Sequence, residues 1–443
     1  MGLGGINYYS TNKKSPLVSF KEATIKGQAP DKGLYFPETI PVLQEDLIKG
    51  IEKLSNEEIA LRVIKPFIGN EIPEDILFQI VSETINFSIP LVKVSEAIYS
   101  LELFHGPTLA FKDVGARFMS RCLGHFLKNE ERNVTVLVAT SGDTGGAVAN
   151  GFFDVKGVDV IILYPSRKVS PVQEKQLATL GKNIHALEVE GTFDDCQQMV
   201  KEAFMDAEIN EKLFLTSANS INVARWLPQQ FYYFLAYKQW ADKDNPPVIS
   251  VPSGNFGNIC AGLLAKHSGL PVKHFVAACN ANDMVPNFLQ TIPNVSLWGN
   301  FKTRRAVSTL SNAMDVGDPS NFVRILEIFN HEFTDLKNGL SSFSITDVET
   351  VATIKDVFEQ YNYILDPHGA VGYLALQKYL VGHNNAKGIF LETAHPVKFP
   401  AAVVSVTGKV IEVPESIAAI MEQETKSTMM QAEFSFLKEY LLK

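Results

Sequence analysis

One lysine of this chain stands in a setting that would suit a nucleophile. Lys112 lies in the stretch LFHGPTLAFKD (103–113), and the three residues directly before it are apolar. Apolar surroundings disfavour an ammonium ion, so they lower the pKa of a lysine and leave a neutral amine that can form a Schiff base. The alternative is a solvated surface lysine, which is what we expect of most other lysines in the chain.

A glycine-rich turn, PSGNFGN (252–258), follows an apolar run and precedes a helical pattern. Gly254 and Gly257 allow backbone angles that turn several N–H groups toward one point, and the following helix adds the positive end of its dipole. Ser253 and Asn255 can donate further hydrogen bonds. The turn predicts a phosphate site, with an empty structural turn as the alternative. Its spacing fits neither the dinucleotide fingerprint nor the Walker loop.

A second turn, TSGDTGGA (140–147), also opens a helix after an apolar run, so its hydroxyls and glycines could hold another anionic group. Asp143 is the unusual member, because a carboxylate repels an anion. Two interpretations remain open from the sequence. Asp143 caps the helix as its N-cap residue, or it accepts a hydrogen bond from a phenol-like ring hydroxyl.

A third turn, ETAHPVKF (392–399), follows the apolar run 388–392. Thr393 stands where this strand is expected to end, so its hydroxyl could face a ligand at the edge of the sheet. His395 is followed by Pro396, a pair that is more typical of a structural turn than of a catalytic group. The third turn therefore contributes Thr393 as its candidate.

Parallel strands would bring these turns together. Short, nearly continuous apolar runs predict buried strands at 134–139, 158–164, 184–190, 247–251, 272–278 and 388–392. Helical stretches such as 223–240 lie between them, and the alternation predicts an α/β fold with open, mostly parallel sheets. In such sheets ligands bind beyond the carboxyl ends of the strands, which is where all three turns lie.

The N-terminal part has a different pattern. Apolar spacing from about 43 to 85 predicts helices, broken at Pro66 and Pro73. We predict three lobes that interleave: a mostly helical lobe at 1–92, an α/β lobe with the lysine at 93–245, and an α/β lobe with the phosphate turn at 246–443.

Composition narrows the class of protein. The chain has 443 residues, of which 46% are hydrophobic and 20% charged, as in ordinary globular proteins. A net charge of −9 gives no footprint for nucleic acid or an anionic membrane surface. We find no membrane-spanning run, no secretory signal and no metal-ligand spacing, and four cysteines without a CxxC pair suit buried thiols in the cytoplasm.

Five motifs in order resemble threonine synthase in its longer form: FHGPTLAFKD, TSGDTG, NSIN followed by an arginine, PSGNFGN and TAHPVKF. YYSTN (8–12) and GLYFP (33–37) are similar too, so the resemblance covers nearly the whole chain. Each motif alone is weakly specific, whereas five in the right order are strongly so. The resemblance implies a fold-type II pyridoxal 5′-phosphate (PLP) enzyme, related to the tryptophan synthase β chain.

The resemblance also implies how the cofactor is held. Lys112 would bind PLP through a Schiff base, and Thr393 would meet the pyridine nitrogen. Asp143 stands where related enzymes often have an asparagine that contacts the ring 3′-oxygen. The cofactor phosphate would be surrounded by Ser253, Gly254, Asn255, Phe256, Gly257 and Asn258.

The implied substrate is O-phospho-L-homoserine, and the implied products are L-threonine and phosphate. The residues expected to bind substrate are Ser141, Gly142 and Thr144 at its carboxylate and Asn219, Ser220 and Arg225 at its phosphate. An arginine can hold a phosphate through two parallel hydrogen bonds. Lys168, together with Arg167, is a second candidate for the phosphate.

The implied reaction takes protons from Cα and Cβ, expels phosphate from Cγ and adds water at Cβ, with Lys112 as the carrier of protons. The nearest alternatives are a threonine-synthase-like phospholyase and a fold-type II dehydratase, and a non-catalytic PLP-binding protein is the alternative from another class. Gly369, in DPHGAVG (366–372), departs from the threonine expected there. The sequence leaves open whether the chain is a monomer or a homodimer.

Overall fold

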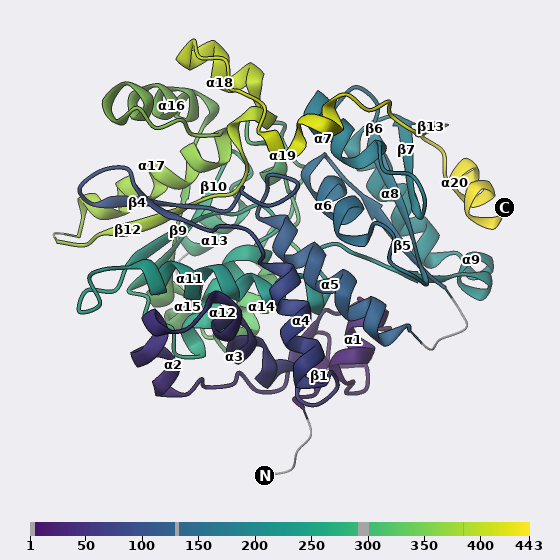
Figure 1. Ribbon diagram of the computed structural model, residues 1–443, viewed down its shortest axis with the longest axis horizontal. Coiled ribbons are helices and arrows are strands. Elements are labelled where there is room, and N and C mark those ends of the chain that lie inside the picture. The colour runs from purple at the N-terminus through teal and green to yellow at the C-terminus, as the bar shows by residue number, and fades with distance from the viewer. Residues whose placement is uncertain (1–4, 129–132, 291–300, 384) are drawn as a thin grey trace.

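The computed structural model describes residues 5–128, 133–290, 301–383 and 385–443. Two open sheets lie side by side, each covered by helices, and helix α5 (Lys112–Phe126) runs between them (Figure 1). Nearly all strand pairs in the two sheets are parallel. The predicted α/β fold with mostly parallel sheets is confirmed.

The six-stranded sheet has the order β11-β10-β9-β12-β4-β3, and only the pair β3·β4 is antiparallel. Its strands are β3 (Leu91–Lys93), β4 (Ile98–Glu102), β9 (Val248–Pro252), β10 (His274–Cys279), β11 (Leu340–Ser344) and β12 (Gly388–Glu392). Strands β9, β10 and β12 are buried along their whole length, which is why they read as continuous apolar runs in the sequence.

The five-stranded sheet is parallel throughout and has the order β13-β7-β6-β5-β8. Its strands are β5 (Val134–Ala139), β6 (Val158–Pro165), β7 (Ile184–Glu190), β8 (Phe214–Thr216) and β13 (Ser427–Gln431). A small antiparallel pair of β1 (Tyr8–Ser10) and β2 (Tyr35–Pro37) lies apart from both sheets.

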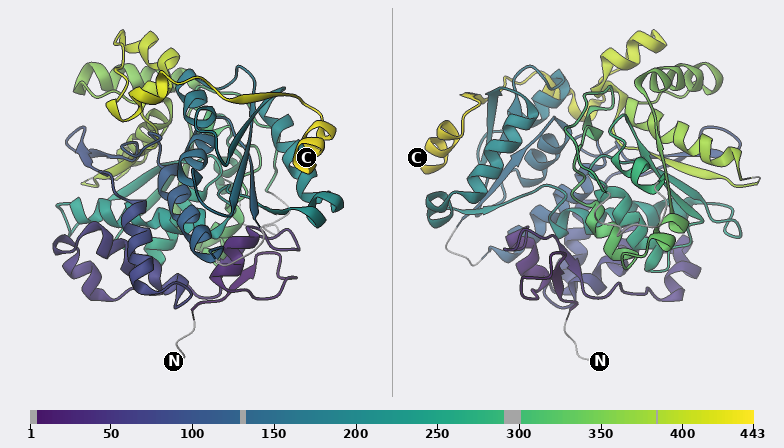
Figure 2. Two further views of the ribbon diagram at one scale, coloured as in Figure 1. Left: turned by 45° about the vertical axis from the view of Figure 1, so that its right-hand side comes forward. Right: turned by 180° about the vertical axis from the view of Figure 1, so that it is seen from behind.

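Sheet membership does not follow contiguous stretches of chain. Strand β4 precedes the five-stranded sheet in sequence but pairs with β12, and β13 leaves the C-terminal part of the chain to pair with β7. Figure 2 shows this C-terminal segment passing from one lobe to the edge of the other. The sheets therefore do not coincide with the segments 93–245 and 246–443, because each segment lends a strand to the other's sheet.

Helices fill the connections between strands. The α-helices are α1 (Phe20–Lys26), α2 (Glu45–Gly50), α3 (Asn56–Ile68), α4 (Glu74–Thr84), α5, α6 (Asp143–Phe152), α7 (Pro171–Ala178), α8 (Phe193–Met205), α9 (Ala207–Lys212), α10 (Val223–Trp226), α11 (Gln230–Gln239), α12 (Gly257–His267), α13 (Met284–Gln290), α14 (Phe322–Ile328), α15 (Phe333–Gly339), α16 (Asp347–Tyr361), α17 (Pro367–Val381), α18 (Pro400–Thr407), α19 (Glu415–Met421) and α20 (Phe434–Leu442). Short 3-10 turns include η1 (Ile51–Lys53), η2 (Leu227–Gln229), η4 (Asn312–Met314) and η5 (Pro396–Lys398).

The predicted break at Pro66 is wrong, because Pro66 lies inside α3. Helix α3 continues through it, since its apolar face is buried and its start carries a capping box of Ser55 and Glu58. Pro73 does precede a new helix, α4, as its N-cap residue. All four cysteines are buried free thiols, as expected.

Two features of the residues that the structure describes bear on the class of protein. Within that part of the chain, no helix is long and apolar enough to cross a membrane. The same residues contain no cluster of three or more histidine, cysteine, aspartate or glutamate side chains that could hold a metal ion.

Candidate active site

The three predicted turns follow β5, β9 and β12, and Lys112 is the first residue of α5. The loop before Lys112 is hydrogen bonded to the turn after β12. The N–H of Phe111 donates to the carbonyl of Thr393, and the N–H of His395 donates to the carbonyl of Leu109, each at 3.0 Å. These backbone bonds bring Thr393 beside the cofactor lysine candidate, although the two lie far apart in the sequence.

The amine of Lys112 lies in a weakly solvated place, although its side chain keeps some exposed surface. Desolvation is the main cause that lowers the pKa of Lys112 to about 8, and the positive charges of Lys398 and Arg225 lower it further. The carboxylate of Asp143 acts in the opposite direction. A larger neutral fraction near neutral pH is what an amine nucleophile requires.

The phosphate turn is built differently from the prediction. Its positive φ belongs to Phe256, at +60°, and not to either glycine. The glycines are required for space: a Cβ on Gly254 would lie 2.6 Å from the Cα of Met314, and one on Gly257 would lie 3.1 Å from the Cβ of Ser220. Close approach of neighbouring chain, rather than backbone angles, explains both glycines.

The turn leaves a row of donors for an anion. The N–H groups of residues 254–258 donate no hydrogen bond to any described residue outside their own helix. Helix α12 begins at Gly257 and points its N-terminus to the same place. The side chains of Ser253 and Asn258 are instead held internally, by the carbonyls of Val251 and Pro252 at 2.8 Å each. This backbone cradle fits the phosphate of PLP.

Asp143 is not an N-cap residue, so that interpretation is wrong. It is the first residue inside α6, and the N-cap position belongs to Gly142, which makes no side-chain cap. One carboxylate oxygen of Asp143 accepts hydrogen bonds from the ammonium of Lys398 at 2.7 Å and from the amide of Gln173 at 2.9 Å. Burial, the largest single effect, raises the pKa of Asp143, but the charges of Lys398 and Lys112 and the hydrogen bonds from Lys398 and Gln173 together hold this pKa well below its usual range.

Lys398 and Gln173 were not among the predicted site residues. Lys398 belongs to the motif TAHPVKF, and its complete burial is unusual for a lysine, which is almost never fully buried unless it is paired. The unexplained carboxylate of Asp143 in an anion-binding turn was the signal that a buried cation had to lie nearby. Gln173 carried no comparable signal.

The turn after β5 is held by Thr140, whose hydroxyl oxygen accepts hydrogen bonds from the N–H groups of Gly142 and Gly145 at 2.9 and 2.8 Å. The N–H of Gly142 is therefore engaged within the turn. Ser141 and Thr144 keep exposed surface. Of the three residues predicted to meet the substrate carboxylate, these two present free surface to a ligand.

The segment with Asn219 and Ser220 lies directly against the phosphate turn. The hydroxyl oxygen of Ser220 accepts hydrogen bonds from the side-chain amides of Asn255 at 2.7 Å and Asn321 at 3.0 Å. Arg324 supports the same segment by donating to the carbonyl of Ser220 at 3.1 Å. The structure thus joins the predicted substrate segment to the predicted cofactor cradle.

Arg324 was missed in the sequence, where nothing distinguishes it from a surface arginine. It is fully buried, stacks over Trp226 with 4.7 Å between the guanidinium carbon and the ring centre, and donates to the carbonyls of Tyr35 and Ile221. Among the described residues it forms no ion pair, so only carbonyl and amide oxygens balance it. Desolvation lowers the pKa of Arg324 to about 9.

Arg225 is also buried, with 3% of its surface exposed. One terminal nitrogen donates to the carbonyl of Ala218, and its Nε has no hydrogen-bond partner among the described residues. Helix α5 passes close by, since a Cβ on Gly115 would lie 3.1 Å from this Nε. Arg167 and Lys168 are exposed instead, in the connection between β6 and α7.

The presence of glycine at position 369 has a steric explanation. A Cβ at this position would overlap the carboxyl group of Glu392, so the threonine expected there would fit only if this buried side chain moved. One oxygen of Glu392 accepts the N–H of Asp366 at 2.8 Å. Burial is the main cause that raises the pKa of Glu392 well above its usual range, and Asp366 raises it further.

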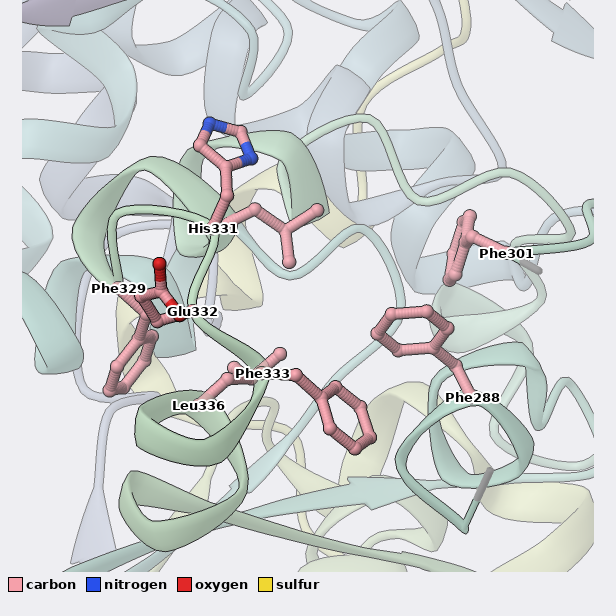
Figure 3. A pocket seen from close by; sticks show the side chains of 8 residues that line it. Phe288, Phe301, Phe329, His331, Glu332, Phe333 and Leu336 are labelled. Carbon is pink, nitrogen blue, oxygen red and sulfur yellow. The ribbon is translucent and has the colours of Figure 1, made fainter. Parts of the chain in front are cut away.

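A separate pocket is lined mostly by aromatic side chains and contains none of the predicted site residues. Figure 3 shows Phe288 between Phe301 and Phe333, with ring centres 5.6 and 5.7 Å apart. These near-perpendicular rings form part of the hydrophobic core around α13 to α15. We assign this pocket to packing rather than to chemistry.

Comparison with known proteins agrees with this geometry. Residues 88–389 match the family described as pyridoxal-phosphate dependent enzyme, and residues 7–85 and 369–441 match the threonine synthase N-terminal and C-terminal regions. The chain is 43% identical to threonine synthase of Haemophilus influenzae over 439 residues, which are 99% of this chain and 100% of that protein. This chain belongs to the threonine synthase family.

Solved structures support the same assignment. Threonine synthase from Escherichia coli superimposes with a TM-score of 0.90 at 40% identity, and the PLP-bound enzyme from Brucella melitensis does so with 0.91 at 35% identity. Each match covers 99% of both chains. The cofactor is PLP and the activity is that of a threonine synthase, a PLP-dependent lyase, as the motifs predict.

We expect Gly254→Ala to lower the affinity for PLP by roughly 10- to 100-fold, because overpacking by one methyl costs about 1–3 kcal/mol. Titration of the apoprotein with PLP, followed by visible absorbance, measures this. Gly50→Ala is the matched control, since a Cβ there meets nothing within 4 Å. Equal affinities for the two variants would contradict the steric account.

We expect Gly369→Ala to destabilise the protein by about 1–3 kcal/mol, because the new methyl overlaps the carboxyl of Glu392. Adding Glu392→Ala should restore part of this loss. The double variant should then lose about 0.5–3 kcal/mol less free energy of unfolding than the two single losses added together. Urea unfolding of the four proteins gives this coupling. Simple additivity would show that Glu392 is not what excludes a side chain at position 369.

Proposed function

We propose that this enzyme converts O-phospho-L-homoserine and water into L-threonine and phosphate, the last step of threonine biosynthesis. The observation that carries this proposal is the contact between two anion-binding segments. The segment of Asn219 and Ser220 hydrogen bonds to the cofactor phosphate turn through Asn255. A substrate that carries its own phosphate has a use for this second segment, whereas the substrate of a dehydratase does not.

The cofactor residues have distinct tasks in this proposal. Lys112 would hold PLP, the main-chain N–H groups of residues 254–258 would bind its phosphate, and Thr393 would donate its hydroxyl to the pyridine nitrogen. Asp143 would face the ring 3′-oxygen. When bound, PLP supplies an electron sink that stabilises negative charge on carbon atoms next to the substrate amine.

Two groups of residues bind the substrate in this proposal. Ser141 and Thr144, at the start of α6, bind the carboxylate, with Gly142 shaping the turn between them. Asn219 and Ser220 orient the phosphate, and Arg225 supplies the positive charge, because its Nε lacks a partner among the described residues. Lys168 is the second candidate for the phosphate.

Lys112 carries the protons. Its Nζ takes up the proton from Cα of the substrate and later returns one there, and a lowered pKa makes the neutral, proton-accepting form available. The strands β5, β9 and β12, whose ends carry the site residues, are buried along their whole length, and phosphate leaves from Cγ. Water then adds at Cβ.

We also propose a cytoplasmic enzyme that acts as a monomer or homodimer. The four cysteines are free and buried, which suits a reducing compartment. Burial raises the pKa of each of their thiols, so none is poised for thiolate chemistry.

The decisive assay supplies O-phosphohomoserine to the PLP-loaded enzyme and measures phosphate and threonine together. We expect equal amounts of the two products, and we expect Lys112→Ala to abolish both products and the visible band of the bound cofactor. Phosphate with 2-oxobutyrate instead of threonine would indicate a phospholyase.

We expect Arg225→Ala to raise KM for O-phosphohomoserine by roughly 10- to 100-fold, because a hydrogen bond to a charged group contributes about 1.5–3 kcal/mol. Its affinity for PLP should change far less. Arg225→Lys keeps the charge and should recover part of the loss. Unchanged kinetics in Arg225→Ala, with a loss in Lys168→Ala, would move the phosphate contact to Lys168.

A further inference from the structure

Lys398 forms an ion pair with Asp143. Among the residues that the structure describes, it is the one ion pair that joins the turns of the two sheets at the active site. Lys398 ends η5, directly after β12 of the six-stranded sheet, and its ammonium lies 2.7 Å from a carboxylate oxygen of Asp143, which follows β5 of the five-stranded sheet. The same ammonium donates to the carbonyl of Thr108 at 2.7 Å. Thr108 lies in the loop that leads to Lys112, so one side chain connects all three segments.

The ion pair is sealed from water. Lys398 has no exposed surface and Asp143 has 4%. A small buried apolar cluster of Leu109, Val172, Val397 and Ile417 includes the chain neighbours of Thr108, Gln173 and Lys398, three residues that hydrogen bond within this network. In such surroundings a charge acts strongly on its neighbours, because little solvent screens it.

We propose that Lys398 is a positioning residue of the active site: its ammonium, 2.7 Å from both a carboxylate oxygen of Asp143 and a carbonyl of the loop before Lys112, fixes Asp143 as an ionised carboxylate and places a positive charge beside the segment of the cofactor lysine. Asp143 can then accept, and cannot donate, a hydrogen bond at the ring 3′-oxygen. The proposal rests on Lys112 as the cofactor lysine, and loss of the visible band in Lys112→Ala tests that part separately.

The charges that act on Lys112 come from three packed elements. Asp143 of α6 favours the protonated form, whereas Lys398 of η5 and Arg225 of α10 oppose it, in line with the direction in which the pKa of Lys112 departs from its usual value. Asp113 is adjacent in sequence, and its carboxylate accepts both the N–H and the hydroxyl of Thr108, at 2.9 and 2.5 Å. Lys398 is thus a cation placed to act on Lys112 and Asp143 together.

The test is a pH titration of the visible absorbance of the PLP-loaded enzyme, without substrate, which follows the proton at the nitrogen of Lys112. Lys398→Gln removes the charge but keeps donors for Asp143 and Thr108. We expect its titration midpoint to rise by about one pH unit or more, because the loss of a nearby like charge favours the protonated form. Asp143→Asn should move the midpoint in the opposite direction.

Two further variants separate charge from packing. Lys398→Arg keeps the charge, and its midpoint should stay within about half a pH unit of the wild type. Gln173→Met removes the neutral donor to the same oxygen of Asp143, and it should also leave the midpoint nearly unchanged. A purely structural role for Lys398 predicts instead that Lys398→Gln and Gln173→Met behave alike.

A midpoint of Lys398→Gln at or below that of the wild type would overturn the proposal. If the absorbance of the wild type does not change over the accessible pH range, the nitrogen of its Lys112 is either unprotonated or protonated throughout. An unprotonated nitrogen in the wild type that begins to titrate in Lys398→Gln supports the proposal. A nitrogen that is fully protonated in the wild type overturns the proposal. If Lys398→Gln does not fold, the same comparison is made by adding Lys398→Met to Asp143→Asn, which leaves no unpaired buried charge. The added substitution should raise the midpoint, and a lack of any rise would again count against the proposal.

Discussion

The active site depends on one contact between the two lobes, the buried ion pair of Lys398 and Asp143. Each charge belongs to the turn after a strand of a different sheet. Neither could stay buried alone, because the transfer of an isolated ion from water costs several kcal/mol even after the protein relaxes. The requirement that each find the other holds the carboxyl ends of β5 and β12 together, at the point where Lys112 begins α5.

Around this contact the close approach of main chain decides the residue types. Gly254 and Gly257 let neighbouring segments reach the phosphate turn, and Gly369 leaves room for the carboxyl of Glu392. The backbone angle that shapes the cradle is provided by Phe256, whose ring is buried against Phe322. Glycine here is a requirement of packing, and it keeps the N–H groups of the cradle accessible to an anion.

The sequence predicts those features of the fold that depend on a local pattern of residue types. The strands β5 and β12 match their apolar runs residue for residue, because strands buried on both faces need no polar alternation. Strand β7 also matches its predicted range, although His185, Glu188 and Glu190 are polar and less buried. The placement of Lys112 and of the three turns follows from strand ends and glycines. What could not be predicted depends on contacts between distant segments: the partner of Asp143, the support of Ser220 by Arg324, and which strands, β4 and β13, the sheets exchange. Short edge strands such as β8 carry too few residues to show a period.

The buried arginine Arg324 shows how such a distant contact bears on the site. Its guanidinium reaches the carbonyls of Ser220 and of Tyr35 in β2, so the N-terminal pair of strands is fixed to the segment that borders the cofactor cradle. No described carboxylate neutralises this charge. A buried cation that only neutral oxygens balance, and that donates to the carbonyl of Ser220, adds positive potential to this segment and so favours a bound anion there. The N-terminal region therefore supports the segment that we propose as the binding site of the substrate phosphate, although none of its own side chains was predicted to touch a phosphate.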